Sequence, residues 1–298
     1  MPTSRLRVLT WNLLEGGMDG RLEGILRHIR SVRPDVVALQ ECNGWHARGE
    51  KLLRHAARTL KMQAFPYWTQ HGYQPAILTR VNGAEAIAHD DQDPFHLGYQ
   101  ELRLPLPGGR TWHFFNTHLN PFEEKARLVE MRTLTRVMKP YRSGFCSLTG
   151  DLNSVAEGDT YLGVRLKLRN KLDLNRNAMI RSRFEFVGLS GLYGYGDVKN
   201  PTAWMRIPVR VRRMKDFADV RTEVIAHLRR EGWIDGFRKL HPREDGHTIP
   251  STIPEGRIDY VWLSPALARR LTRCEVMYGR KLAKLSDHCP ILWEVSVD

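Results

Sequence analysis

Carboxylate, amide and imidazole side chains end several of the apolar, strand-like runs of this sequence. Each of them alone is an ordinary strand-end or turn residue, because Asp and Asn side chains hydrogen-bond to their own backbone. Together they supply only hard oxygen ligands and imidazoles, the donor set expected of a Mg²⁺ site that carries out phosphate chemistry. The eight positions are Asn12, Glu41, His118, Asp151, Asn153, Asp259, Asp287 and His288.

Residues 148–153, LTGDLN, show the two interpretations side by side. Gly150 tolerates a positive φ, and Asp151 and Asn153 are common turn residues, so this segment alone favours a strand that ends in a turn. The alternative is a pair of oxygen ligands at the mouth of an active site. The rest of the chain has to distinguish between them.

Strands and helices along the chain must position these residues. Helical spacing predicts helices at 19–35, 45–60 and 122–139, the first with Asp19 as its N-cap and Pro34 just past its end. Apolar runs predict strands at 5–13, 35–41, 63–68, 74–80, 99–106, 111–119, 145–153, 257–264, 274–279 and 289–297. The pattern predicts one mixed α/β domain over residues 1–298, with two packed sheets and helices outside.

The composition is that of an ordinary globular protein, with 42% hydrophobic residues in a chain of 298. No segment approaches the roughly 18 apolar residues of a membrane helix, and the N-terminus lacks the features of a signal peptide. We therefore expect a cytoplasmic protein without integral membrane association. The cysteines form no C-x-x-C pair, which argues against a zinc cluster and a disulfide framework; they are Cys42, Cys146, Cys274 and Cys289.

Basic residues are concentrated in one segment of the chain. The formal net charge is +13, and residues 160–215, with thirteen Lys and Arg against three acidic residues, contribute +10 of it. Residues 164–172 and 206–215 alternate basic and apolar positions, as a strand with one basic face would. We expect a basic insertion at about 156–225 that is either a solvated face or an anion-binding surface. In the second case its substrate-binding residues would be Arg210, Arg212 and Arg213.

Six short motifs follow one another between residues 11 and 288, namely WN, QE, THL, GDLN, RIDYV and SDH. In this order they resemble the motifs of the endonuclease/exonuclease/phosphatase superfamily of metal-dependent phosphoesterases. Each motif alone is a weak signal, whereas six in the right order are specific. The resemblance implies the family's four-layer α/β/β/α sandwich of two packed mixed β-sheets flanked by helices. It also implies that GDLN is both a turn and an active-site motif.

The resemblance further implies a metal site. Glu41 would be the principal ligand of Mg²⁺, with Mn²⁺ as an alternative metal. Asn12 would lie beside it, and Asp287 would lie near the metal.

For the remaining residues the resemblance implies catalytic roles. Asp151 would orient or deprotonate the attacking water, and Asn153 would hold a phosphate oxygen. Asp259 would pair with His288, fixing its tautomer and favouring its charged form. His288 and His118 would contact the phosphate as its charge builds.

The leading functional hypothesis is a Mg²⁺-dependent nuclease, because a polyanion gains affinity from every counterion that basic residues release. The alternative is a lipid or small-molecule phosphoesterase, since basic surfaces also meet anionic membranes. A non-catalytic nucleic-acid-binding module is less expected, because every expected catalytic position holds a competent residue. Abasic-site cleavage is also less expected, because NTHLNP stands where the AP endonuclease branch has a tyrosine-bearing segment. No obligate protein partner is inferred.

Overall fold

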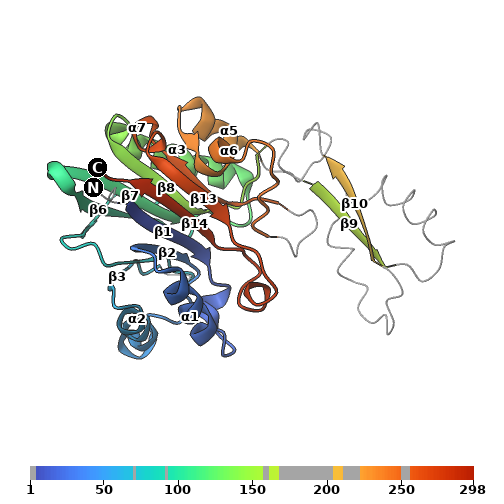
Figure 1. The fold of residues 1–298 in the computed structure, drawn as a ribbon, viewed down its shortest axis with the longest axis horizontal. Coiled ribbons are helices and arrows are strands. Elements are labelled where there is room, and N and C mark those ends of the chain that lie inside the picture. The colour runs from blue at the N-terminus through green and yellow to red at the C-terminus, as the bar shows by residue number, and fades with distance from the viewer. Residues whose placement is uncertain are drawn as a thin grey trace.

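Two six-stranded mixed sheets lie face to face in the computed structural model of the protein, and helices cover their outer faces (Figure 1). This is the four-layer α/β/β/α sandwich that the sequence predicted. The structure describes residues 5–69, 72–90, 93–156, 161–167, 204–210, 222–249 and 256–298.

The first sheet is built from segments at both ends of the described chain. Its strands are β1 (Arg5–Asn12), β2 (Val36–Gln40), β3 (Gln63–Pro66), β4 (Ala76–Thr79), β13 (Leu271–Val276) and β14 (Ile291–Ser296). They lie in the order β13-β14-β1-β2-β4-β3, and only β1 and β2 are parallel among these neighbours.

The second sheet comes from the middle of the chain. Its strands are β5 (Glu85–Ile87), β6 (Tyr99–Leu106), β7 (Arg110–His118), β8 (Phe145–Asp151), β11 (Ile234–Asp235) and β12 (Asp259–Leu263). They lie in the order β11-β12-β8-β7-β6-β5, and β7 and β8 are its parallel pair.

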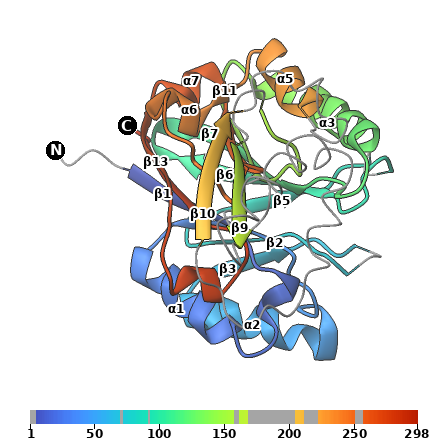
Figure 2. The same ribbon diagram turned by 90° about the vertical axis from the view of Figure 1, so that its right-hand side faces the viewer.

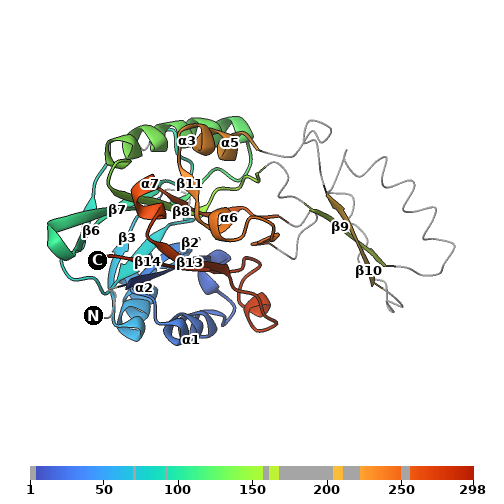
Figure 3. The same ribbon diagram turned by 45° about the horizontal axis from the view of Figure 1, so that its top comes forward.

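Helices form the two outer layers (Figure 3). The first sheet is covered by α1 (Leu22–Val32) and α2 (Ala47–Leu60), and the second by α3 (Glu124–Met138) and α5 (Glu223–Arg230). The shorter helices are α6 (Gly236–Leu240), α7 (Pro265–Ala268), η1 (Glu15–Gly17), η2 (Pro107–Gly109), η3 (Lys139–Tyr141) and η6 (Leu282–Lys284). In the described part of the chain, no helix has the length and apolar character needed to cross a membrane.

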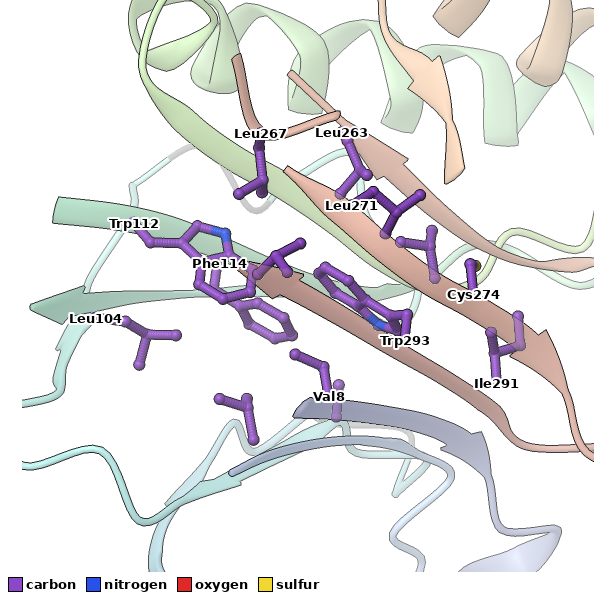
Figure 4. Close-up of a cluster of buried hydrophobic side chains, with 14 of the residues drawn as sticks. Val8, Leu104, Trp112, Phe114, Leu263, Leu267, Leu271, Cys274, Ile291 and Trp293 are labelled. Carbon is purple, nitrogen blue, oxygen red and sulfur yellow. The ribbon is translucent and has the colours of Figure 1, made fainter. Parts of the chain in front are cut away.

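Three apolar clusters separate the four layers. The central cluster lies between the sheets and includes Val8 of β1, Trp112 and Phe114 of β7, and Trp293 of β14 (Figure 4). The Trp112 and Trp293 rings meet there in a T-shaped contact, with centroids 5.5 Å apart. Because successive side chains point to opposite faces of a strand, Leu9 belongs instead to the cluster under α1 and α2. Both sheets are therefore buried on both faces, which explains their nearly continuous apolar strands.

Strand direction brings the predicted site residues to one end of the sandwich. Because β1 and β2 are parallel and Asn12 pairs with Gln40, Asn12 and Glu41 lie at the same end of the first sheet. In the second sheet His118 pairs with Asp151, and Asp259 at the start of β12 lies opposite Asp151. We call this end, where the residues of both sheets meet, the site end. It is on the right in Figure 1 and faces the viewer in Figure 2.

A separate two-stranded ribbon lies beyond the site end (Figures 1 and 3). It consists of β9 (Tyr161–Lys167) and β10 (Trp204–Arg210), which overlap the two alternating basic segments of the insertion. The antiparallel register pairs Arg165 with Arg206. Arg210 ends β10, whereas Arg212 and Arg213 lie outside the described residues.

The predicted N-cap of the first helix is wrong. The helix α1 begins at Leu22 with Arg21 as its N-cap, and no side chain caps it. Asp19 lies earlier, with a φ of 57° in a left-handed turn, so it precedes the helix by too many residues to bond its first N–H groups. Pro34 does follow the end of the helix, directly after Arg33.

Candidate active site

Asn12 connects the two sheets at the centre of the site. Its amide nitrogen Nδ2 donates to Oε1 of Glu41 and to Oδ2 of Asp151, both at 3.1 Å. Its oxygen Oδ1 accepts from the backbone N–H of Leu14 at 3.0 Å, which defines the orientation of the amide. Asn12 is completely buried. One amide group therefore holds a carboxylate from each sheet.

Glu41 directly follows β2 in an uncommon backbone conformation. Its φ is 54°, in the left-handed region that glutamate rarely adopts. Its Oε2 accepts from the backbone N–H of Glu15 at 2.9 Å, while Oε1 accepts from Asn12. Each carboxylate oxygen keeps a further lone pair. Glu41, which is half-buried, can thus bind a cation without giving up either hydrogen bond.

His288 and Asp259 form a buried pair. Nδ1 of His288 lies 2.8 Å from Oδ2 of Asp259, the pairing that the family resemblance implied. The other ring nitrogen, Nε2, lies 3.8 Å from Oδ2 of Asp151. Nε2 of His118 lies 3.5 Å from the same oxygen of Asp151. Two imidazoles from different sheets therefore converge on one carboxylate oxygen.

The carboxylates control the charge of His288. Burial alone would lower the pKa of His288, but Asp259, Asp151 and Asp287 together raise it to about 10. The ring is therefore positively charged at neutral pH. The pKa of Asp259 is raised, mainly by burial and further by the charge of Asp151. The charge of His288 and its hydrogen bond to Asp259 lower this pKa in part.

The GDLN segment forms the predicted turn and brings its polar side chains to the site. Oδ1 of Asp151 accepts from the backbone N–H of Asn153 at 2.9 Å. Asn153 has a φ of 47°, and its Nδ2 donates to the carbonyl of Leu119 at 2.9 Å. Gly150 lies where a Cβ atom would be 2.0 Å from the carbonyl oxygen of Thr117. Only glycine allows β8 and β7 to approach so closely beside Asp151.

Two hydroxyl groups support the pair, and neither is among the eight predicted residues. Oγ1 of Thr248 accepts from the backbone N–H of Asp259 at 3.1 Å. Its hydrogen bond to the Asp259 carboxylate, like the contact with His288, lowers the pKa of Asp259 and so opposes burial and the charge of Asp151. Oγ of Ser286 donates to the carbonyl of Asn12 at 2.7 Å and accepts from the N–H of His288 at 3.1 Å. Ser286 is the first residue of the SDH motif, which was the available sequence signal.

A buried arginine links the two loops that follow His118 and Asn153. Arg127 of α3 is completely buried, and its Nη1 donates to the carbonyl of Asn120 at 2.7 Å. Its Nε donates to Oγ of Ser154 at 3.1 Å. Nothing in the sequence marks Arg127 for this role, because helical spacing alone does not distinguish a buried arginine from an exposed one.

Asp287 and the predicted substrate-binding arginines are placed differently from the central residues. Asp287 is half-buried and precedes His288, whose pKa it raises. Arg210 lies in the ribbon beyond the site end. The structure thus brings seven predicted residues together through direct contacts or adjacent strand ends, and it places Asp287 next to His288 in the chain.

The donor set fits a divalent cation. Asp151, Asp259 and His288 each offer a ligand atom, and these atoms lie within 4.8 Å of one another. Because Asp259 and His288 already bond each other, the more available carboxylates are Glu41 and Asp151, which Asn12 bridges. Within the described residues, neither of these two carboxylates is hydrogen-bonded by Lys or Arg, so both keep lone pairs available for a cation.

The fold resembles several solved structures. These include the 3′ phosphatase NExo from Neisseria bound to a product DNA hairpin, with a TM-score of 0.62, 16% identity and coverage of 97% of this chain and 99% of that one. An AP endonuclease from Archaeoglobus fulgidus matches with a TM-score of 0.60, 16% identity and coverage of 97% and 98%. D. rerio TDP2 complexed with a single strand DNA product matches with a TM-score of 0.58, 16% identity and coverage of 98% of each chain.

The sequence itself also has a family assignment. No curated protein matches this sequence. The model of the endonuclease/exonuclease/phosphatase family matches residues 9–288, which includes every predicted motif. The protein therefore belongs to the endonuclease/exonuclease/phosphatase family, whose members hydrolyse phosphoester bonds.

Proposed function

We propose that the protein is a Mg²⁺-dependent phosphodiesterase that hydrolyses phosphodiester bonds in nucleic acid. The observation that carries the proposal is the arrangement around Asp151, where Asn12 holds Glu41 on one side and two imidazoles converge on the other. Phosphodiester hydrolysis needs an in-line water, a group that orients it and positive charge for the transition state. These side chains can supply all three.

Glu41 is the residue that we assign as the principal metal ligand, with Asn12 and Asp287 near the metal. A divalent cation bound there would withdraw charge from a phosphate oxygen and help to activate the attacking water. Carboxylate and amide oxygens suit Mg²⁺, and Mn²⁺ is the alternative metal.

The remaining side chains act on water and phosphate. Asp151 orients the attacking water and accepts its proton. Asp259 fixes the proton of His288 on Nδ1, which leaves Nε2 to donate to a phosphate oxygen. His118 donates to the same phosphate group, and Asn153 has a second amide N–H for a further oxygen, because one already bonds Leu119.

Nucleic acid is the substrate class that the charge distribution favours. The net charge of +13 and the basic ribbon beyond the site end would attract an extended polyanion more strongly than a small phosphate ester. The structures of TDP2 and NExo, which share this fold, hold DNA products. A phospholipid or an inositol phosphate is the competing substrate.

A substrate panel tests the proposal. Turnover is measured with single- and double-stranded DNA, RNA, a phospholipid and an inositol phosphate, each with Mg²⁺, Mn²⁺ or a chelator. We expect hydrolysis of nucleic acid that requires the metal. Glu41→Gln should lose most of this turnover while its melting temperature stays unchanged, and Glu85→Gln, which alters an exposed glutamate of β5, should retain it. Preferential hydrolysis of the phospholipid, or full turnover by Glu41→Gln, would overturn the proposal.

A further inference from the structure

One end of the molecule carries exposed aromatic side chains on several loops. Among the residues whose side chains the structure describes, four Trp, Tyr or Phe side chains are exposed, and their exposed fractions run from 39% to 67%. All four lie on loops at the site end. They are Trp68, Tyr73, Phe122 and Tyr278.

The strand pairing fixes the position of these loops. Trp68 and Tyr73 lie between β3 and β4, whose ends pair next to Leu39, two residues before Glu41. Phe122 follows His118, the last residue of β7. Tyr278 follows β13 in the segment that leads to Asp287 and His288. The rings therefore come from loops of both sheets at the site end, and we call them the aromatic rim.

Contacts hold Trp68 in a defined orientation in the loop between β3 and β4. Its ring makes a T-shaped contact with His46, with centroids 5.9 Å apart. Nδ1 of His46 lies 2.6 Å from Nε2 of the buried Gln74. The carbonyl of Gln74 in turn accepts from the N–H of Cys42 at 2.7 Å, which ties this loop to the residue after Glu41. An exposed ring that is anchored in this way does not behave as a loose surface side chain.

Phe122 is oriented by the same kind of contact on the other side of the site. Its ring lies T-shaped to His96, with centroids 5.7 Å apart. Its backbone N–H donates to Oδ1 of Asn120 at 2.8 Å. The backbone N–H of His96 donates to the buried Glu130 at 2.7 Å, so both members of the ring pair are attached to the framework.

We propose that the aromatic rim is a stacking site for unpaired nucleobases next to the scissile phosphate, with Trp68 as its main platform. The inference rests on the proposed nuclease function and specifies its substrate as single-stranded or unpaired nucleic acid. Base stacking on aromatic side chains is tolerant of sequence and works together with basic groups that follow the backbone. The loop of Tyr278 supplies such groups, because its exposed cations are Arg280, Lys281 and Lys284.

A membrane surface fits the rim less well. Insertion into lipid needs an apolar patch that protrudes on one side. The rim rings instead come from separate loops on both sheets, and two of them are braced by histidines. Paired bases are also disfavoured, because their faces are already stacked within the duplex. An unpaired base offers a free ring face to Trp68.

Equilibrium binding to two matched oligonucleotides tests the inference. One is a labelled single-stranded oligonucleotide, and the other has the same backbone with tetrahydrofuran residues in place of the nucleosides. Fluorescence anisotropy is measured in a chelator, so that metal-dependent cleavage does not interfere. We expect the parent protein to bind the base-bearing strand about 5- to 150-fold more tightly, the range that stacking of a base provides.

Three variants locate the effect. Trp68→Leu should weaken binding of the base-bearing strand by about 5-fold or more and leave the abasic strand unchanged. Trp68→Phe keeps a ring and should restore most of the difference. Val129→Ala removes an exposed apolar side chain from α3, away from the rim, and should bind both strands as the parent does.

The outcomes separate this inference from the proposed function. Equal affinity of the parent for the two strands, or equal weakening of both by Trp68→Leu, would overturn the stacking site even if nucleic acid is hydrolysed. Loss of binding to phosphatidylserine vesicles by Trp68→Leu, with an unchanged ratio for the two strands, would assign the rim to lipid. Base-dependent binding through Trp68 without any hydrolysis would support the rim and contradict the nuclease activity.

Discussion

Nδ1 of His288 lies 2.8 Å from Oδ2 of Asp259, and both side chains are more than nine-tenths shielded from solvent. The hydrogen bond leaves only Nε2 of the ring to face Asp151 and a bound phosphate. Asp259 therefore acts through His288, as a positioning residue for the imidazole.

We expect Asp259→Asn and His288→Ala each to lower kcat by about 10- to 100-fold, the usual effect of losing such a partner. The double variant should lose little more than the worse of the two, because groups that act as a unit are not additive. Steady-state kinetics of the four proteins at saturating substrate measure this coupling. Losses that multiply in the double variant would show that the two side chains act independently.

Gly150→Ala should unfold or strongly destabilise the protein. Gly150 has a φ of 133°, and an added Cβ would lie 2.0 Å from the carbonyl oxygen of Thr117. Backbone strain of about 1–3 kcal/mol and a similar overpacking cost predict a loss of roughly 2–6 kcal/mol in the free energy of unfolding. Gly144→Ala is the control, because its Cβ would meet only Tyr141 at an ordinary 3.7 Å. Urea unfolding that shows similar stability for the two variants would contradict the prediction.

The periodicity of apolar residues was enough to predict most of the strands and the strand ends at which the site residues lie. The predicted strand at 99–106 has the same bounds as β6, and the strand ends at Asn12, His118 and Asp151 follow from apolar runs that stop at a polar residue. Very short elements such as β11 could not be predicted, because two residues have no periodicity. The register of the ribbon is likewise a property of pairing and not of either strand alone.

The roles of the supporting residues depend on tertiary contacts and so could not be predicted. Ser286 bonds both Asn12 and His288. These two residues lie 276 positions apart in the sequence, and only the folding of the first sheet brings them together. Arg127 occupies an ordinary helical position, and only the packing of α3 against the loops after His118 and Asn153 buries it. Asp19 does not cap the first helix for a local reason, because a left-handed turn separates it from the start of the helix.

Arg127→Met should destabilise the protein even though methionine fills similar apolar space. Arg127 donates to the carbonyl of Asn120, to Ser154 and to Glu124, and its charge also lowers the pKa of the buried Glu130. Its loss removes the cationic partner of Glu124 and the side-chain donor to the carbonyl of Asn120, which predicts a decrease of about 3–5 kcal/mol in the free energy of unfolding.

Chemical denaturation of Arg127→Met and of Arg136→Met, an exposed arginine of the same helix, provides the comparison. We expect Arg136→Met to stay within about 0.5 kcal/mol of the parent, as surface substitutions usually do. Turnover of folded Arg127→Met should also fall, because the loops after His118 and Asn153 lose their common anchor. Equal stability of the two variants would show that Arg127 does not hold these loops.

Glu130 should make the protein less stable as the pH rises from about 5 to 7. Burial raises the pKa of Glu130 from 4.5 to about 7, although the N–H groups of Asn120 and His96 and the charge of Arg127 oppose this. The folded protein therefore binds a proton that the unfolded chain has already released, and stability falls with pH in this interval. A shift of this size corresponds to about 3 kcal/mol, fully expressed above the folded pKa.

The measurement is the free energy of unfolding of the parent and of Glu130→Gln across this pH range. The amide cannot ionise, so the stability of the variant relative to the parent should increase from pH 5 to about 7 and then level off. Glu85→Gln should show no such change, because Glu85 is exposed in β5. A parent-to-variant difference for Glu130→Gln that does not vary with pH would mean that the carboxylate remains ionised throughout, held by its two backbone donors.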